Sequence, residues 1–195
     1  LQGTHWNAKV IDKSAVKINR KDKKIMISVI EDKPLIDNIS DYDVILVGTN
    51  CYQVMRNGFQ YDIAKKFPYV KEMNNSTKYG DPSKVGTILE CNGTPLVTLI
   101  YITFGYNFKG NDKEYLDYNA LEQCLKLCGI LYNGKKVATT MLGCTFYDGN
   151  GQKDKVLDIM EHTMKNVSLD VYDYKQLSYR DIKRKEFEKL KSKHQ

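Results

Sequence analysis

The residues best placed to do chemistry follow an apolar run at residues 44–47. Gly48, Thr49 and Asn50 come directly after this run, and Gly58 opens the next helical stretch. Because the run lacks polar alternation, it is typical of a strand buried on both faces of a sheet. In open α/β sheets ligands bind beyond the carboxyl ends of such strands, and the N–H groups at a helix start suit an anion. The pattern indicates a phosphate site, although many α/β proteins carry a glycine at such a turn.

A second strand–loop–helix unit lies further along the chain. Residues 136–142 have the pattern of a strand, and a loop with three glycines follows at residues 143–151. Residues 153–165 have the apolar spacing of an amphipathic helix, and residues 168–172 form another strand-like run. We expect the parallel strands to place both glycine-containing loops at one edge of the sheet. This arrangement favours a nucleotide or another phosphorylated ligand.

Other segments complete an α/β pattern. Asn92-Gly93 between two apolar runs is a strong hairpin signal, and Gly129 is expected to end the helix before it. The further predicted elements are strands at 15–18, 25–30, 86–90 and 96–103, short helix 35–39, helices 59–67 and 115–128, loop 74–82, and a helix from Ser178.

Over residues 25–174 the chain resembles the macrodomains, a family that binds ADP-ribose. Family members have a strand ending in Asn-Ala-Ala-Asn and then a triple-glycine loop. Here Asn50 and Gly58 match, while Arg56 and Asn57 replace the other two glycines. The resemblance implies a three-layer α/β/α fold with a central mixed, mostly parallel sheet.

The resemblance also implies a function. It implies ADP-ribose binding and, in an eraser, removal of mono-ADP-ribose from proteins without a cofactor or metal. Asn50 corresponds to the catalytic asparagine at the distal ribose, where a water held near the substrate phosphate attacks C1″. A side-chain amide can donate to one ribose hydroxyl and accept from another. The alternative interpretation is a turn asparagine.

Two residues are expected to contact the adenine end of the ligand. Asp32 has the position of the family's adenine-binding aspartate, and its alternative role is to cap a helix. Tyr172 matches an aromatic residue that stacks on adenine, and its alternative role is packing at the sheet edge.

The remaining expected ligand contacts lie in the two loops. They are Gly48, Thr49, Gly58, Phe59, Gly143, Cys144, Thr145, Phe146 and Tyr147. Backbone can approach a diphosphate closely only where side chains are absent, and Thr145 and Asp148 replace two further family glycines. Arg56 can partly compensate by pairing with phosphate.

These departures leave a second function class open. A degenerate macrodomain-like module would no longer bind ADP-ribose and would instead bind RNA or a protein partner through its basic surface. The net charge is +6, and basic residues concentrate in residues 13–24 and 183–193. Ordinary solvated faces explain most such runs.

Composition limits the remaining possibilities. A chain of 195 residues with 42% hydrophobic content suits one domain, which we place at residues 25–176 between a lead-in (1–24) and a basic helix or linker (177–195). The sequence contains no apolar run long enough to span a bilayer and no signal-peptide pattern. Its five cysteines and three histidines form no metal-binding pattern, and Cys124 and Cys128 are expected to be buried thiols.

Composition also indicates the cellular compartment and the kind of genome that encodes the protein. The odd cysteine count favours a reducing, cytoplasmic compartment. The high Lys, Asn and Tyr content is typical of AT-rich genomes, and with Leu1 at the start it favours a piece of a viral replicase polyprotein. A phage or bacterial origin is also compatible. We expect a monomer or a part of a larger polyprotein, without membrane insertion.

Overall fold

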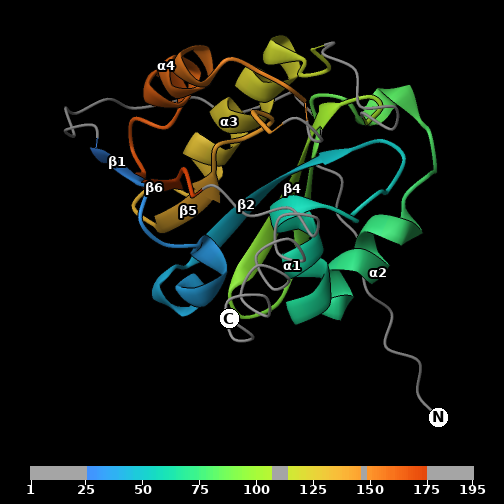
Figure 1. Cartoon of the computed structure of the whole chain (residues 1–195), viewed down its shortest axis with the longest axis horizontal. Helices are drawn as coiled ribbons and strands as arrows, with labels where there is room; N and C mark the ends of the chain where they lie inside the picture. Colours follow the sequence, from blue (N-terminus) through green and yellow to red (C-terminus); the bar gives the residue numbers. More distant parts are fainter. Residues whose placement is uncertain (1–25, 107–113, 146–148, 175–195) are drawn as a thin grey trace, which may run out of the picture.

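A six-stranded sheet forms the centre of the molecule (Figure 1). The computed structural model describes residues 26–106, 114–145 and 149–174. The strand order is β1-β6-β5-β2-β4-β3; all neighbouring pairs are parallel except β3 and β4. The strands are β1 (Met26–Ile30), β2 (Val44–Asn50), β3 (Ile88–Cys91), β4 (Leu96–Thr103), β5 (Lys136–Thr140) and β6 (Ser168–Tyr172).

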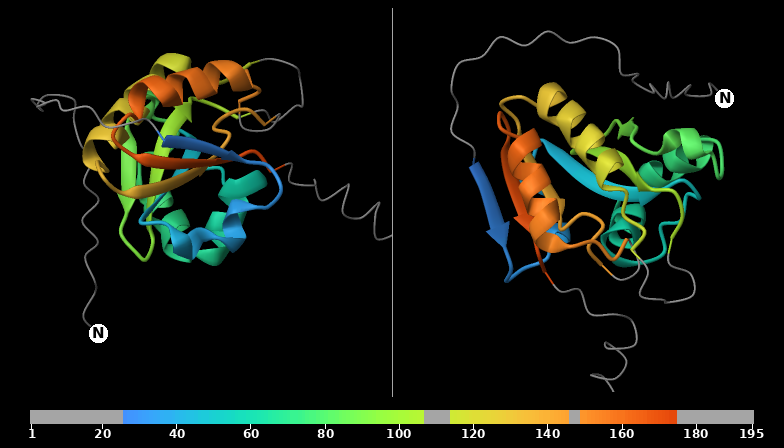
Figure 2. Two further views of the ribbon diagram at one scale, coloured as in Figure 1. Left: turned by 90° about the vertical axis from the view of Figure 1, so that its left-hand side faces the viewer. Right: turned by 90° about the horizontal axis from the view of Figure 1, so that it is seen from above.

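Helices cover both faces of this sheet (Figure 2). On one face lie α1 (Gly58–Lys66) and α2 (Pro68–Ser76), together with the short 3-10 helices η1 (Leu35–Asp37) and η2 (Ile39–Asp41). On the other face lie α3 (Tyr118–Leu131) and α4 (Lys153–Thr163). A third 3-10 helix, η3 (Pro82–Lys84), precedes β3. The expected three-layer α/β/α fold with a mixed, mostly parallel sheet is confirmed.

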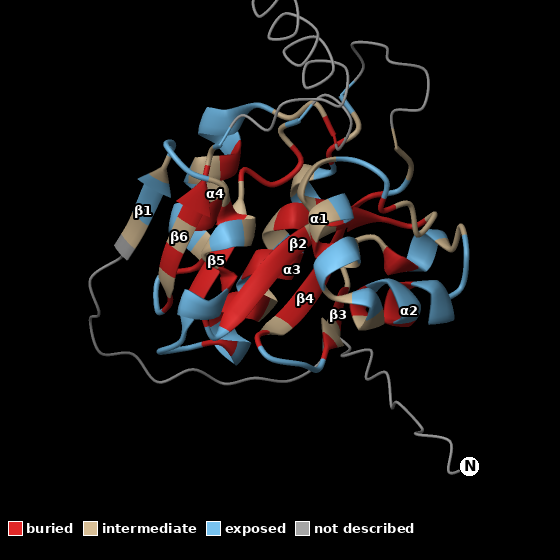
Figure 3. Ribbon diagram, turned by 60° about the horizontal axis from the view of Figure 1, so that its bottom comes forward, coloured by how far each residue is buried: buried red, intermediate tan, exposed pale blue. Residues whose placement is uncertain are grey.

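The core is centred on β2 and β4 (Figure 3). Seven of the eight residues of β4 are buried, and six of the seven residues of β2 are buried. Strands covered on both faces lack polar alternation, which is why the run at residues 44–47 could be recognised in the sequence. Since β2 lies between β5 and β4, its carboxyl end opens at the middle of the sheet edge.

The expected end of α3 at Gly129 is wrong, because the helix continues to Leu131. A Cβ atom on Gly129 would lie 2.4 Å from the carbonyl oxygen of Thr163, at the end of α4. This glycine therefore permits close packing of two helices that are distant in the sequence. The expectation for Cys124 and Cys128 is confirmed, since both thiols are fully buried in α3.

Other expectations differ in their outcome. The hairpin around Asn92-Gly93 is confirmed by the antiparallel pair β3 and β4. Helix α2 was not expected, and its last three residues occupy the start of the predicted loop at 74–82. The strand at 15–18, the helix from Ser178 and both basic runs lie outside the described residues. Within the described ranges no helix is long and apolar enough to cross a membrane, and no group of three or more His, Cys, Asp or Glu side chains can hold a metal ion.

Candidate functional site

The carboxyl ends of β2 and β5 border a small cavity, the inner pocket. Its volume is about 20 Å³, which is room for roughly one water molecule. Both expected glycine loops contribute to it, through Gly48 and Gly143. The lining residues are Val47, Gly48, Thr49, Phe59, Gln60, Ile102, Thr140, Leu142 and Gly143.

A second cavity, the outer pocket, lies beside the inner one. Its volume is about 30 Å³. Phe59 and Thr140 line both pockets, so the two cavities are neighbours along the same sheet edge. The lining residues are Pro34, Leu35, Ile36, Phe59, Asp62, Thr140, Tyr172 and Tyr174.

Asn50 organises the turn that follows β2. Its Oδ1 accepts hydrogen bonds from the N–H groups of Tyr52 (3.0 Å) and Val54 (3.2 Å), and its Nδ2 donates to the Val54 carbonyl (2.9 Å). A primary amide offers two donors and two acceptor lone pairs, so one N–H donor remains. The side chain is 3% exposed. The left-handed residue of this turn is Gln53, with φ +59°, rather than Asn50.

The start of α1 presents backbone N–H groups. The first helical hydrogen bond is donated by Tyr61 to the carbonyl of Asn57, and the Asn57 side chain does not cap the helix. The N–H groups of Gly58 and Phe59 precede this bond. Gly58 has φ +57°, a conformation that suits glycine. Arg56, expected to pair with phosphate, is exposed next to this helix start.

Thr49 lines the inner pocket and carries a buried hydroxyl. The residue is 1% exposed, and its Oγ1 has no hydrogen-bond partner among the described residues. A buried hydroxyl without a partner is costly, so such an atom in a residue that lines a cavity is a candidate to bond a ligand or solvent.

The second glycine loop packs on Leu116. Cβ atoms on Gly143 and Gly151 would lie 2.7 Å and 2.5 Å from Leu116 side-chain carbons. The Gly149 carbonyl accepts hydrogen bonds from the N–H groups of Tyr115 and Leu116. The space that these glycines provide is therefore occupied by the protein itself. Of the other expected contacts in this loop, Cys144 is half-buried, Thr145 is exposed, and Phe146 and Tyr147 lie outside the described residues.

The outer pocket contains two tyrosines in different settings. Tyr172 is 3% exposed, and its hydroxyl lies 2.8 Å from that of Tyr42. The Tyr42 hydroxyl donates its proton to the Asp170 carboxylate at 2.7 Å, so in its hydrogen bond with Tyr172 the Tyr42 oxygen is the acceptor and Tyr172 is the donor. Burial, followed by these hydrogen bonds, raises the pKa of Tyr42 well above its usual value. Tyr174, by contrast, is 41% exposed and offers an accessible ring.

Sequence reasoning missed Asp62, Thr140 and Tyr174 as lining residues. Asp62 lies one helical turn after Gly58 on α1, and this spacing was the one sequence signal that could have placed it on the same helix face as Gly58.

Comparison with known proteins identifies the fold. No protein-family model and no curated protein sequence matches the chain. Among solved structures, a protein of unknown function from Bacteroides thetaiotaomicron aligns with a TM-score of 0.60 at 19% identity, covering 77% of this chain and 99% of that one. The macrodomain of Mycobacterium tuberculosis DarG aligns with a TM-score of 0.57 at 13% identity, covering 76% and 97% of the two chains. This chain has the macrodomain fold. Thermosipho africanus DarTG, determined in complex with ADP-ribose, aligns with a TM-score of 0.57 at 15% identity, covering 80% of this chain and 45% of that one.

The macrodomain fold brings together part of the expected site. Five expected residues line the pockets: Gly48, Thr49, Phe59, Gly143 and Tyr172. Asp32 is exposed after β1 and lines neither pocket, nor does it cap η1, whose N-cap is Pro34. Four more of the expected site residues in the described ranges line neither pocket: Asn50, Gly58, Cys144 and Thr145.

Proposed function

We propose that this chain binds ADP-ribose along the carboxyl edge of β6, β5 and β2. The observation that carries the proposal is the pair of neighbouring pockets that meet at Phe59 and Thr140. The adenine end would occupy the outer pocket, the diphosphate would lie at the start of α1, and the distal ribose would point towards Asn50.

The chemistry of each part supports this orientation. In the outer pocket, the Tyr174 ring offers a stacking surface and the Asp62 carboxylate can accept a hydrogen bond from an exocyclic amine. At the start of α1, backbone N–H groups favour an anion, and the neighbouring Arg56 adds positive charge. The similarity to DarTG, whose structure contains ADP-ribose, supports the proposal through the fold alone.

The sizes of the pockets imply that the protein adjusts when the ligand enters. Volumes of about 20 and 30 Å³ suit single water molecules, whereas pockets that hold drug-sized ligands measure roughly 300 Å³ or more. Phe59 is half-buried between the pockets. Rotation of its ring would join them into one groove.

A finer proposal is that the site removes mono-ADP-ribose from proteins. The remaining N–H donor of Asn50 would orient a ribose hydroxyl, and a water held near the substrate phosphate would attack C1″. The natural partner would then be an ADP-ribosylated protein. The free state of all five cysteines supports a reducing, cytoplasmic setting.

Calorimetric titration with ADP-ribose tests binding. We expect micromolar affinity in the intact chain and at least tenfold weaker binding in Tyr174→Ala. Tyr61→Ala is the matched control, since Tyr61 is also an exposed tyrosine, on α1, but lines neither pocket. Absence of binding, or equal losses in both variants, would contradict the proposed site.

One observation favours a second candidate function, binding of single-stranded RNA. The rings of Tyr79 and Phe104 lie 5.3 and 5.2 Å from the ring of Tyr52 and are 65% and 43% exposed. Exposed aromatic rings can stack on nucleobases. Salt-sensitive binding of a short RNA without any binding of ADP-ribose would favour this function over the first.

A further inference from the structure

The turn after β2 contains a residue in an unfavourable backbone conformation. Gln53 has φ +59°, in the left-handed region that residues with a Cβ atom rarely adopt. Such a conformation persists only when surrounding contacts hold it, and it is a reason to ask what the conformation is for.

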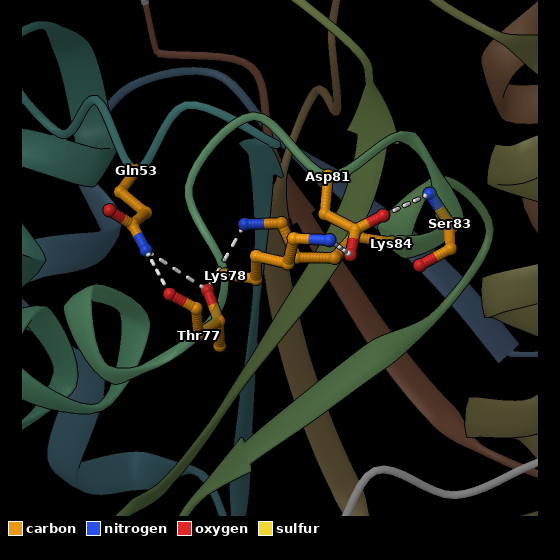
Figure 4. Close-up of polar contacts among 6 residues, drawn as sticks. All are labelled: Gln53, Thr77, Lys78, Asp81, Ser83 and Lys84. Atoms are coloured by element: carbon orange, nitrogen blue, oxygen red, sulfur yellow. Dashed lines mark hydrogen bonds and ion pairs between the residues drawn. The ribbon is translucent and has the colours of Figure 1, made fainter.

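The side chain of Gln53 provides the holding contacts. Its Nε2 donates to the carbonyl oxygen of Thr77 at 2.6 Å and lies 3.2 Å from the Thr77 hydroxyl (Figure 4). A longer contact of 3.4 Å joins it to the carbonyl oxygen of Asn75. These bonds connect the turn to the last turn of α2 and to the residue that follows it.

The Thr77 hydroxyl is the centre of this arrangement, the Gln53–Thr77–Lys84 clamp. It donates to the carbonyl of Asn74 at 2.7 Å, so it accepts from the Lys84 ammonium at 3.0 Å and from Gln53 (Figure 4). Lys84 is only 9% exposed, and its ammonium also lies 5.0 Å from the centre of the Tyr101 ring. A buried cation depends on such partners, which makes the position of Thr77 well defined.

The clamp and the Asn50 side chain hold the same turn. Asn50 forms hydrogen bonds with the backbone of Tyr52 and Val54. Gln53 lies between these two residues in the sequence, and its side chain bonds to Thr77 instead. The N–H of Gly80 also donates to the Cys51 carbonyl at 2.9 Å. Loss of the Gln53–Thr77 contacts would therefore make the turn that fixes the Asn50 amide more mobile.

We propose that Gln53 and Thr77 are positioning residues, which hold the turn at residues 51–54 so that the Asn50 amide meets the distal ribose of the bound ligand. The inference rests on the proposed function. Part of ribose recognition then depends on two residues that line neither pocket. A clamp that served stability alone would leave the selectivity between ligands unchanged.

Comparison of two ligands tests the role of the clamp. ADP lacks the distal ribose, so the affinity of the variants for ADP should differ less than twofold from that of the parent chain. Gln53→Ala should weaken the binding of ADP-ribose about tenfold, because the turn that holds Asn50 is no longer preorganised. Gln53→Gly also lacks the side-chain bonds but accommodates a positive φ, so its loss should be smaller, about threefold.

The hydroxyl is tested by an isosteric pair. Thr77→Val should weaken the binding of ADP-ribose less than Gln53→Ala does, because the bond from Gln53 to the Thr77 carbonyl remains. Thr77→Ser should restore the affinity, because serine keeps the hydroxyl. Hydrogen exchange at the amides of Tyr52 and Val54, which bond to Asn50, should be faster in Thr77→Val and in Gln53→Ala. Circular dichroism establishes that each variant is folded.

The outcomes separate the two proposals. Suppose that the intact chain binds ADP-ribose and that the variants lose affinity for ADP and ADP-ribose equally, or lose affinity for neither. The positioning role is then overturned, while the proposed function stands. If the intact chain binds no ADP-ribose, the proposed function fails and the positioning role fails with it. Selective loss of ADP-ribose, with faster exchange in the turn, supports both.

Discussion

Replacing Thr49 by valine separates a hydroxyl that serves a ligand from one that serves the fold. Thr49 lines the inner pocket, and its buried Oγ1 bonds to no described residue. Thr139, on β5, is the matched control, because it is equally buried and its Oγ1 donates to the Leu46 carbonyl at 3.0 Å. Valine has nearly the shape of threonine, so both substitutions mainly remove a hydroxyl.

The two variants should differ in the sign of their effect. Loss of the Thr139 hydrogen bond should lower the free energy of unfolding by about 0.5–1.5 kcal/mol. Thr49→Val breaks no bond within the described protein, so we expect a change between zero and a gain of about 1 kcal/mol. In a chain of this size 1 kcal/mol corresponds to about 2–4 °C in melting temperature.

Thermal unfolding and calorimetry give the two measurements. Thr49→Val should melt at or above the temperature of the parent chain and bind ADP-ribose about fivefold more weakly, as expected for loss of one ligand hydrogen bond. Thr139→Val should melt lower and bind normally once folded. If Thr49→Val is destabilised as much as Thr139→Val, the Thr49 hydroxyl has a structural partner and the reasoning fails.

Three further changes have defined outcomes. Gly129→Ala should lower stability by about 1–3 kcal/mol, because its Cβ would meet the Thr163 carbonyl at 2.4 Å, although alanine favours helices; a higher melting temperature would contradict this packing. Burial lowers the pKa of Lys84, so the unfolded chain binds more protons between that lowered value and 10.5. The stability of the parent relative to Lys84→Met should therefore rise with pH through this window, and a flat difference would refute it. Phe59→Ala should join the pockets and accelerate ADP-ribose association at least about threefold in stopped-flow measurements, while unchanged rates would show that the ring does not limit entry.

Local patterns in the sequence identified most of the sheet. The run that forms β2 is continuously apolar because the strand is buried on both faces, and Asn92-Gly93 marks the only antiparallel pair of the described sheet. Helix α2 was missed because its residues are mostly polar, and only Val70, Met73 and Asn74 are buried. Gly129 was misread because its reason for being glycine is contact with α4, which no local pattern reveals.

The site was predictable only where strand order determines it. Parallel strands explain why Gly48 and Gly143 meet at one cavity. Asp62 and Tyr174 were not predicted, because their positions depend on how α1 and the segment after β6 pack against the strand ends. The ligand roles of Asp32 and Asn50 stay predictions. Asn50 illustrates why a single residue type is ambiguous, since most of its hydrogen-bonding capacity serves its own turn.

The packing of the second glycine loop on Leu116 affects how related sequences should be interpreted. Gly143 and Gly151 are required by that contact whether or not a nucleotide ever binds. Selection for folding alone would therefore preserve them in a lineage that had lost its ligand. The Thr49 hydroxyl has no such second duty among the described residues, so it would be free to drift. In a collection of relatives, variation at residue 49 beside invariant loop glycines would be the signature of a macrodomain that has retained its shape and abandoned its ligand.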